Sequence, residues 1–476
     1  MWNFSLFEEE DLINFLERGI LDKEIEELLN QWEELSPKVH YHLIKHLRSG
    51  EFKPELLQKA LGVKYQTAVA LLKNPAVEFD FPTASVKGGQ VVRALAVKDT
   101  PETFCNLREL KRHIKPVEEY LRSQGRLSEH ISLFFEAPIR GNSFQLALAL
   151  SLSLRELPPS LCWSGGVKKE GRLTKVDSLK EKAELCQSMG KRLADPSHFK
   201  NLQELCQWLE KPFVEVPLAV SKDPLRVEEF FKDSQELLNL KNILRLQEES
   251  LVLLTGKLEG SLWQEVAEKF VKRVKELDYM LMRRLKAHVV INGPASLAFA
   301  LGILYGHTRP SVIYHYNPSS RRYHPIELEN TREIKEHVNQ YELVETQLFE
   351  APGEDLSVVL FFAHHNPVSD IRAFLEKEGI RGDMLVLTTM QSRGNLSPEL
   401  FKSVAKEIAS AIQERKGAKH YANLHFFFSC PVAIAYLFGV AFGHFNKGFI
   451  YNYNKEGGYE RVLSIELLRD LIEKAL

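Results

Sequence analysis

The chain has 476 residues and a formal net charge of −2 at neutral pH. A chain of this length is expected to form about three domains, each with its own hydrophobic core. The near balance of charge excludes a global attraction to nucleic acid. The five cysteines are scattered, odd in number and without a Cys-x-x-Cys pair, which favours a reducing compartment and argues against a zinc site.

The chain shows no pattern typical of a targeting or membrane segment. Residues 1–10 are acidic where a signal peptide is basic. Two apolar stretches, 288–307 and 424–445, are nearly long enough to span a bilayer, but Pro294 and Pro431 interrupt them, and each is better explained as strand–turn–helix. We expect a soluble, cytoplasmic protein without a membrane partner.

Residues 1–77 form a helical N-terminal region in this interpretation. Apolar residues recur there at helical spacing, which predicts helices over 8–18, 22–35, 38–48, 54–61 and 65–73. The last two have the outline of a helix-turn-helix. The second of them offers few basic or amide groups for bases, so we expect a bundle that packs on the next domain or on a partner, and no DNA binding.

The region that follows, 78–225, carries a serine and a lysine in a pattern that suggests chemistry. Strands are expected at 77–81, 90–97 and 131–135, and after the last of them the chain breaks at Pro138 and Gly141 before an apolar helix. This places the Ser143 hydroxyl at a helix N-terminus, where free N–H groups and the helix dipole stabilise an oxyanion.

Lys182 lies on a second predicted helix. On that helix Leu179, Lys182, Ala183 and Cys186 follow the spacing of a buried stripe, while Lys180 points to solvent. A lysine among apolar neighbours loses proton affinity and can serve as general base for a serine. Considered alone, Ser143 would be a helix cap and Lys182 a surface lysine. Considered together, the two residues predict a Ser–Lys dyad.

These residues resemble the proteolytic domain of the Lon proteases. The resemblance rests on Gly141-Asn-Ser143, on Ser164-Gly-Gly166 and on the run from Gly171 to Lys182, and it spans roughly residues 78–220. It implies a Ser–Lys endopeptidase. The chain departs from the family pattern at Asn142 (for proline), Ser164 (for threonine), Gly166 (for glutamate) and Asp177-Ser178 (for two glycines).

Lon proteases usually carry an ATPase, and this sequence contains no phosphate-binding loop. The nearest approach, Thr255-Gly-Lys-Leu, fails at its last position. We therefore expect proteolysis without ATP and without a cofactor, controlled by something other than nucleotide hydrolysis.

After a connecting helix expected over 226–249, the C-terminal half, 250–476, contains an internal repeat. The run from His288 to Gly302 parallels the run from His425 to Gly439 at an offset of 137 residues. The two copies are expected over about 250–345 and 346–476, each with an amphipathic helix (263–285 and 398–416) before the repeated run. Each copy reads as a Rossmann-like parallel sheet, so the fold class is α+β and α/β, multidomain.

In parallel sheets, ligands bind at the carboxyl ends of the strands. The loops at those ends are rich in hydroxyl groups, N–H groups and tyrosines, with one lysine and one arginine, which suit phosphates and stacked bases. The candidate ligand-binding residues are Thr255, Gly256, Lys257, Asn292, Gly293, Pro294, Tyr314 and Tyr316 from the first copy, and Thr389, Met390, Gln391, Ser392, Arg393, Ser429, Cys430, Tyr451 and Tyr453 from the second. The alternative is a duplicated structural sheet whose tyrosines belong to the core.

The strand–Pro–helix–Gly runs and the later Tyr-x-Tyr resemble a SAVED domain, a double sensor related to the CARF fold. Together, the two resemblances match the CRISPR-associated Lon–SAVED proteases of the CalpL type. They imply antiviral signalling in which a cyclic oligoadenylate, cyclic tetraadenylate by that resemblance, is the activator. They also imply allosteric assembly into an oligomer or filament and cleavage of a specific protein substrate, in that family an anti-sigma-like partner.

Two other functions remain open from the residues. The Lon-like domain could be a proteolytically silent scaffold gated by the nucleotide, or the sensor could also degrade its cyclic ligand.

Overall fold

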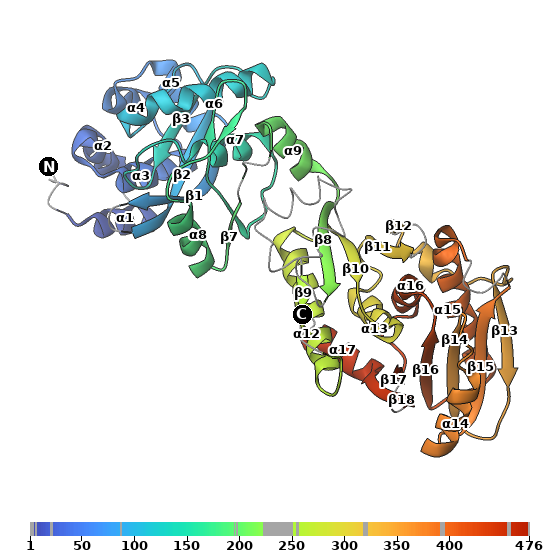
Figure 1. Ribbon diagram of the computed structural model, residues 1–476. Helices are drawn as coiled ribbons and strands as arrows, with labels where there is room; N and C mark the ends of the chain where they lie inside the picture. The colour runs from blue at the N-terminus through green and yellow to red at the C-terminus, as the bar shows by residue number, and fades with distance from the viewer. Residues whose placement is uncertain are drawn as a thin grey trace. The chain divides into compact units, whose positions relative to one another are not determined.

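The computed structural model describes residues 4, 7–19, 22–85, 88–194, 196, 199–221, 251–253, 257–317, 322–390, 396–454 and 458–474. The chain divides into two compact units, the first Met1–Lys211 with Asn242–Arg245, the second Pro212–Lys241 with Leu246–Leu476. The predicted connecting helix at 226–249 lies outside the described residues. Figure 1 labels the elements of each unit.

The first unit joins the N-terminal helices to the sheet that follows them. The helices are α1 (Glu9–Arg18), α2 (Asp22–Asn30), α3 (Pro37–Ser49), α4 (Pro54–Leu61) and α5 (Tyr65–Lys73), close to the predicted ranges. Their apolar faces share one core with Leu95, Val97 and Phe134 of the sheet. The expected packing of this bundle on the next domain is therefore present, and residue 77 does not separate two compact units.

The sheet under this bundle is antiparallel and has the order β1-β2-β3. Its strands are β1 (Ala76–Ser85), β2 (Gly88–Thr100) and β3 (His130–Phe135), with α6 (Lys111–Ser123) in the connection between β2 and β3. After β3 come α7 (Gln145–Ser153), β4 (Leu161–Trp163), β5 (Gly166–Val167), β6 (Leu173–Thr174), α8 (Leu179–Ser188), β7 (Arg192–Ala194) and α9 (Leu202–Glu210). β4 pairs in parallel with β7, and β5 with β6 as a hairpin.

The second unit contains two sheets of matching topology. The first has the order β12-β11-β10-β8-β9, and the second has the order β13-β15-β14-β16-β17-β18. The first sheet and its helices are β8 (Val214–Ser221), β9 (Leu251–Leu253), α12 (Leu262–Met280), β10 (Leu285–Ile291), α13 (Ala295–Tyr305), β11 (Ser311–Asn317) and β12 (Arg322–Leu328). The second comprises β13 (Val344–Phe349), β14 (Asp355–Phe361), α14 (Val368–Glu378), β15 (Gly382–Thr389), α15 (Phe401–Ala418), β16 (Asn423–Ser429), α16 (Val432–Phe442), β17 (Gly448–Asn454) and β18 (Gly458–Ser464), and α17 (Ile465–Lys474) ends the chain.

Four adjacent strands of each sheet are parallel, as predicted, and one edge of each sheet is an antiparallel hairpin, β11–β12 or β17–β18. β8 corresponds to β14 and β9 to β15. α14 and its aromatic residue Phe374 pack on one face of the second sheet, against Phe427, Tyr451 and Tyr459. The repeat seen in the sequence is thus a repeat of structure.

The two copies meet where α13 crosses α16. A Cβ on Gly302 would lie 2.1 Å from the carbonyl oxygen of Tyr436, and a Cβ on Gly439 would lie 2.2 Å from that of Phe299. The two contacts are related by the repeat offset of 137 residues, so the crossing has local two-fold symmetry. Only glycine allows the helix backbones to approach this closely.

Two boundaries differ from the sequence prediction. β8 pairs with β9 and β10, so the second unit begins before residue 225, where the protease-like region was expected to end. The helix predicted over 263–285 ends at Met280, because Met282 and Arg283 adopt left-handed backbone conformations (φ 52° and 61°) and start the turn into β10.

In the described part of the chain, no helix combines the length and apolar character needed to cross a bilayer.

Candidate functional site

Ser143 lies in the turn between β3 and α7 and is 6% exposed. α7 begins at Gln145, its N-cap residue is Phe144, and no side chain caps it. The N–H groups of Gln145 and Leu146 donate to the carbonyl oxygens of Asn142 and Gly165. The Ser143 hydroxyl therefore does not cap the helix, and an oxyanion site would draw on the N–H groups of Ser143 and Phe144.

Lys182 lies on α8 and is 4% exposed, whereas Lys180 is exposed, so the predicted orientation of this helix is confirmed. Burial lowers the pKa of Lys182 below its usual 10.5, and nearby Asp177 and Glu181 oppose the shift. In the regions that the structure describes, no carboxylate forms an ion pair with its ammonium group. A buried lysine without a paired charge is suited to hold and release a proton.

The segment from Leu161 to Gly165 contacts the surroundings of both residues. At one end the free thiols of Cys162 and Cys186 form a hydrogen bond within a small apolar cluster, and Cys186 lies one helical turn from Lys182. At the other end the N–H of Gly165 donates to the Ser143 carbonyl oxygen at 3.2 Å. Three residues of extended chain span only about 10 Å, so this segment holds the serine turn and the lysine helix in one small region.

Two departures from the Lon pattern fit one another. A Cβ on Gly166 would lie 2.6 Å from the amide nitrogen of Asn142 and 2.3 Å from the hydroxyl of Thr174. The Asn142 side chain thus fills space that a side chain at position 166 would need. At Ser178, where the family has glycine, the backbone is left-handed (φ 58°), a conformation that glycine adopts without strain.

In the second unit, most described candidates for ligand binding lie at the carboxyl ends of the parallel strands. Asn292, Gly293 and Pro294 follow β10, and Ser429, Cys430 and Pro431 end or follow β16. Each proline is the N-cap residue of a helix, α13 or α16, and no side chain caps either helix. The free N–H groups of the two first turns are suited to bind phosphate.

The structure brings the two copies together at this edge. The Ser296 hydroxyl, in the first turn of α13, donates to the Asn452 side chain of β17 at 2.8 Å. Neither residue was among the predicted ligand contacts. Residue 452 could have been identified from the alternation along β17, because it points to the face opposite Tyr451 and Tyr453.

Tyr314 and Tyr451, two of the predicted ligand contacts, each bond to a histidine of their own sheet. Their hydroxyl groups each lie 2.9 Å from the Nδ1 atom of a histidine, His288 and His425 respectively. Tyr451 is 4% exposed and stacks on Phe427, so its ring belongs to the core, whereas Tyr314 is half-buried. Burial raises the pKa of both tyrosines to about 12.

These histidines are also close to a carboxylate in each copy. Glu215 approaches His288 at 3.8 Å, and Asp355 approaches His425 at 3.7 Å. The neighbouring His288, together with the Lys286 ammonium group at 3.3 Å, lowers the pKa of Glu215 to about 2. The repeated acid–His–Tyr arrangement ties three parallel strands of each sheet together, and this explains why the sequence repeats His and Tyr at these positions.

The remaining described candidates differ in accessibility. Tyr316 and Tyr453 are 45% and 46% exposed and contact Tyr323 and Tyr459 across their hairpins. Thr389 is buried, Met390 is exposed, and Lys257 forms an ion pair with Glu259 at 2.8 Å. Thr255, Gly256, Gln391, Ser392 and Arg393 lie outside the described residues.

His365 near this edge was also missed by sequence reasoning. The carbonyl group of His365, in the loop after β14, accepts a hydrogen bond from the Ser429 hydroxyl at 3.0 Å. The apolar run that forms β14, followed by His364-His365, was the available signal. Within the ranges that the structure describes, no group of three or more His, Cys, Asp or Glu residues is arranged to hold a metal ion.

Comparison with solved structures found SAVED/CARF-domain containing Cap4 receptors. The Acinetobacter baumannii receptor with the cyclic trinucleotide 3'3'3'-cAAA is 11% identical, with a TM-score of 0.41 over 81% of this chain and 94% of the receptor. The same receptor with 2'3'3'-cAAA is 16% identical (TM-score 0.37), and there the match covers 55% of this chain and only about half, 52%, of the receptor. The Moraxella osloensis receptor is 12% identical, with a TM-score of 0.37 over 82% of this chain and 94% of the receptor.

A comparison with curated proteins found no match. The family model described as "SMODS-associated and fused to various effectors sensor domain", SAVED, matches residues 264–465. That range begins in α12 and ends at the start of α17, so it covers most of both repeated sheets. The second unit of this chain therefore carries a SAVED domain.

Proposed function

We propose that this protein is a Ser–Lys endopeptidase that is switched on when a cyclic oligoadenylate binds its SAVED domain. The observation that carries the proposal is a buried Lys182, without an ion-pair partner among the described residues, in the same compact unit as the buried Ser143. A lysine whose pKa is lowered by burial is the kind of base that a serine nucleophile requires.

In this mechanism, the neutral amine of Lys182 takes the proton from the Ser143 hydroxyl as its oxygen attacks the peptide carbonyl carbon. The N–H groups of Ser143 and Phe144 stabilise the resulting oxyanion. The ammonium group of Lys182 then donates its proton to the leaving amine. In the second half of the reaction, Lys182 takes a proton from water as the water oxygen attacks the acyl-enzyme, and it returns the proton to the Ser143 oxygen.

The ligand is proposed to bind at the shared carboxyl edge of the two sheets. Phosphates would bind at the uncapped first turns of α13 and α16, and the half-exposed rings of Tyr316 and Tyr453 are available to adenine bases. The resemblance to Lon–SAVED proteases favours cyclic tetraadenylate, type III CRISPR signalling and assembly of protomers on ligand binding. The substrate would be one dedicated partner, cut once or a few times.

The test uses the full-length protein, cyclic tri-, tetra- and hexaadenylate, and the protein encoded beside it as the candidate substrate. We expect one ring size to trigger cleavage without ATP and to increase particle size in light scattering. Ser143→Ala, Lys182→Ala and Lys182→Arg should abolish cleavage with ligand affinity unchanged, because a guanidinium group does not release its proton near neutral pH.

Lys180→Ala is the matched control, and it should cut at the wild-type rate. Cleavage that persists in Ser143→Ala, or that needs ATP hydrolysis, would contradict the proposal. Ligand binding without cleavage of any partner by the wild-type protein would favour the nucleotide-gated scaffold.

A further inference from the structure

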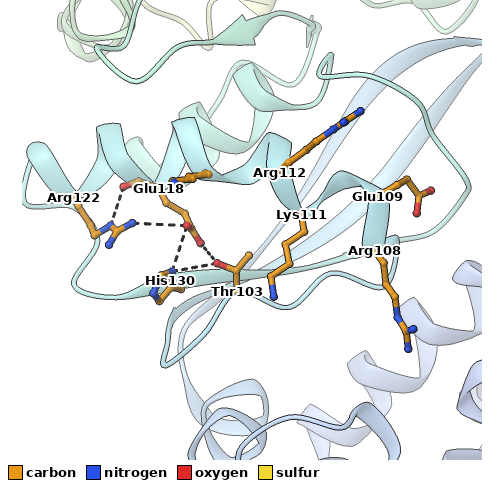
Figure 2. Close-up of a pocket in the computed structure, with 9 residues that line it drawn as sticks. Thr103, Arg108, Glu109, Lys111, Arg112, Glu118, Arg122 and His130 are labelled. Atoms are coloured by element: carbon orange, nitrogen blue, oxygen red, sulfur yellow. Dashed lines mark hydrogen bonds and ion pairs between the residues drawn. The ribbon is translucent and has the colours of Figure 1, made fainter.

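A row of basic side chains lines an open pocket of about 700 Å³ in the first unit. The pocket is lined by Thr103, Arg108, Glu109, Lys111, Arg112, Lys115, Glu118, Arg122 and His130. Figure 2 shows Arg122, Glu118, Lys111 and Arg108 in succession along α6 and the turn before it. Five permanent cations against two lining carboxylates, with Glu33 paired to Arg108 from outside the pocket, leave this pocket positive in a chain whose net charge is −2.

The buried carboxylate of this pocket, that of Glu118, already accepts hydrogen bonds from neighbouring groups. Glu118 is 2% exposed and accepts hydrogen bonds from the Thr103 hydroxyl at 2.7 Å and from the Ile131 N–H at 2.9 Å. His130 and Arg122 approach it at 3.4 Å and 3.8 Å. Glu118 therefore fixes the floor of the pocket rather than neutralising the lysines at its rim.

The lysines of the rim are available to a ligand. Lys111 and Lys115 are exposed, one helical turn apart, and neither pairs with a carboxylate among the residues that the structure describes. Unpaired ammonium groups on one helix face attract a partner with closely spaced negative charges.

The helix that carries this row is connected to the proposed nucleophile. Pro116 interrupts the hydrogen-bond ladder of α6. The nearby His113 carbonyl oxygen accepts from the Gln145 side chain at 2.5 Å, and the same side chain accepts from the Val167 N–H at 2.8 Å. Gln145 is the first residue of α7, two residues after Ser143. A hydrogen bond therefore links α6 directly to the segment that carries the serine.

We propose that this basic row is a docking site for an acidic segment of the protein substrate, an inference that rests on the proposed protease function. From Arg108 to Arg122 the row is roughly 20 Å long, which an extended peptide of about seven residues covers. A nucleic acid fits less well, since the described lining residues include no Phe, Tyr or Trp on which a base could stack.

The first test measures binding alone and needs no cleavage. A fluorescent peptide of about eight glutamates is titrated into full-length Ser143→Ala protein at low and high salt, with anisotropy as the readout. We expect salt-sensitive binding that weakens at least tenfold in the double variant Lys111→Glu/Lys115→Glu. The matched control, Lys269→Glu/Lys272→Glu, changes two exposed lysines of α12 and should bind like the parent.

Absence of peptide binding, or an equal loss in both double variants, would overturn the proposal. So would a single-stranded oligonucleotide that binds through Lys111 and Lys115 while the peptide does not, because the site would then be a nucleic-acid surface.

The second test asks whether the site serves cleavage. In the active protein, Lys111→Glu/Lys115→Glu should raise KM for the partner at least tenfold with kcat nearly unchanged, and unchanged KM would refute a docking role. If no partner is cut by the parent protein, the protease proposal fails, and the peptide titration still decides whether the basic row binds acidic chains.

Discussion

The crossing of α13 and α16 offers a sharp test of how the SAVED domain is built. Gly302→Ala adds one methyl group at a point where its carbon would lie 2.1 Å from the Tyr436 carbonyl oxygen. That oxygen belongs to a helix backbone and cannot rotate away, so the two helices must move apart.

The size of the effect follows from this distance. A carbon–oxygen contact needs roughly 3.2 Å, so the helices must separate by about 1 Å, and overpacking of this kind costs about 1–3 kcal/mol. For a unit of this size we expect the melting temperature to fall by about 3–10 °C.

Gly417→Ala is the matched control, because Gly417 lies in α15 and a Cβ there would meet nothing within 4 Å. Replacing a helical glycine by alanine without a clash should stabilise the protein by about 0.5–1 kcal/mol. Calorimetry on the full-length protein compares the two variants. A melting temperature of Gly302→Ala at or above that of the wild type would contradict the close approach of α13 and α16.

Three further predictions concern the two sites. Lys182→Met should be more stable than wild type near pH 7, because burial lowers the pKa of the lysine and the unfolded chain then binds the proton more tightly. The gain in the free energy of unfolding should shrink as pH rises toward 10.5, as measured by denaturant titrations at several pH values, with Lys180→Met at the exposed position as the control. Ser178→Gly should stabilise the protein by about 1 kcal/mol by relieving the left-handed backbone, and a lower melting temperature would contradict that conformation. Asn452→Ala should weaken cyclic oligoadenylate binding severalfold in calorimetry, because it removes the bond to Ser296 that joins the two copies at the ligand edge. Unchanged affinity would place the ligand elsewhere.

Local sequence patterns were sufficient for much of the secondary structure. The five N-terminal helices are determined by apolar spacing and by neighbours in the chain, and the structure has all five close to the predicted ranges. The burial of Lys182 and the exposure of Lys180 follow from helical periodicity alone. The repeat at 137 residues could be read by comparing the chain with itself, because equivalent core positions need equivalent side chains.

Local sequence patterns could not predict the contacts between distant segments of the chain. β8 joins the second unit through parallel pairing with β10, more than sixty residues later, and nothing within β8 specifies that partner. Period-two alternation puts Tyr451 and Tyr453 on one face of β17, but only the packing of α14 decides that the first is core and the second is accessible.

The sequence by itself therefore determined the elements, their faces and the duplication, since these depend on residues close together in the chain. The tertiary structure alone decided that Ser296 meets Asn452, 156 residues away, and that Glu118 lies beneath a basic row. Such contacts depend on how sheets pair and helices cross, which is set by the packing of the whole unit rather than by any single segment.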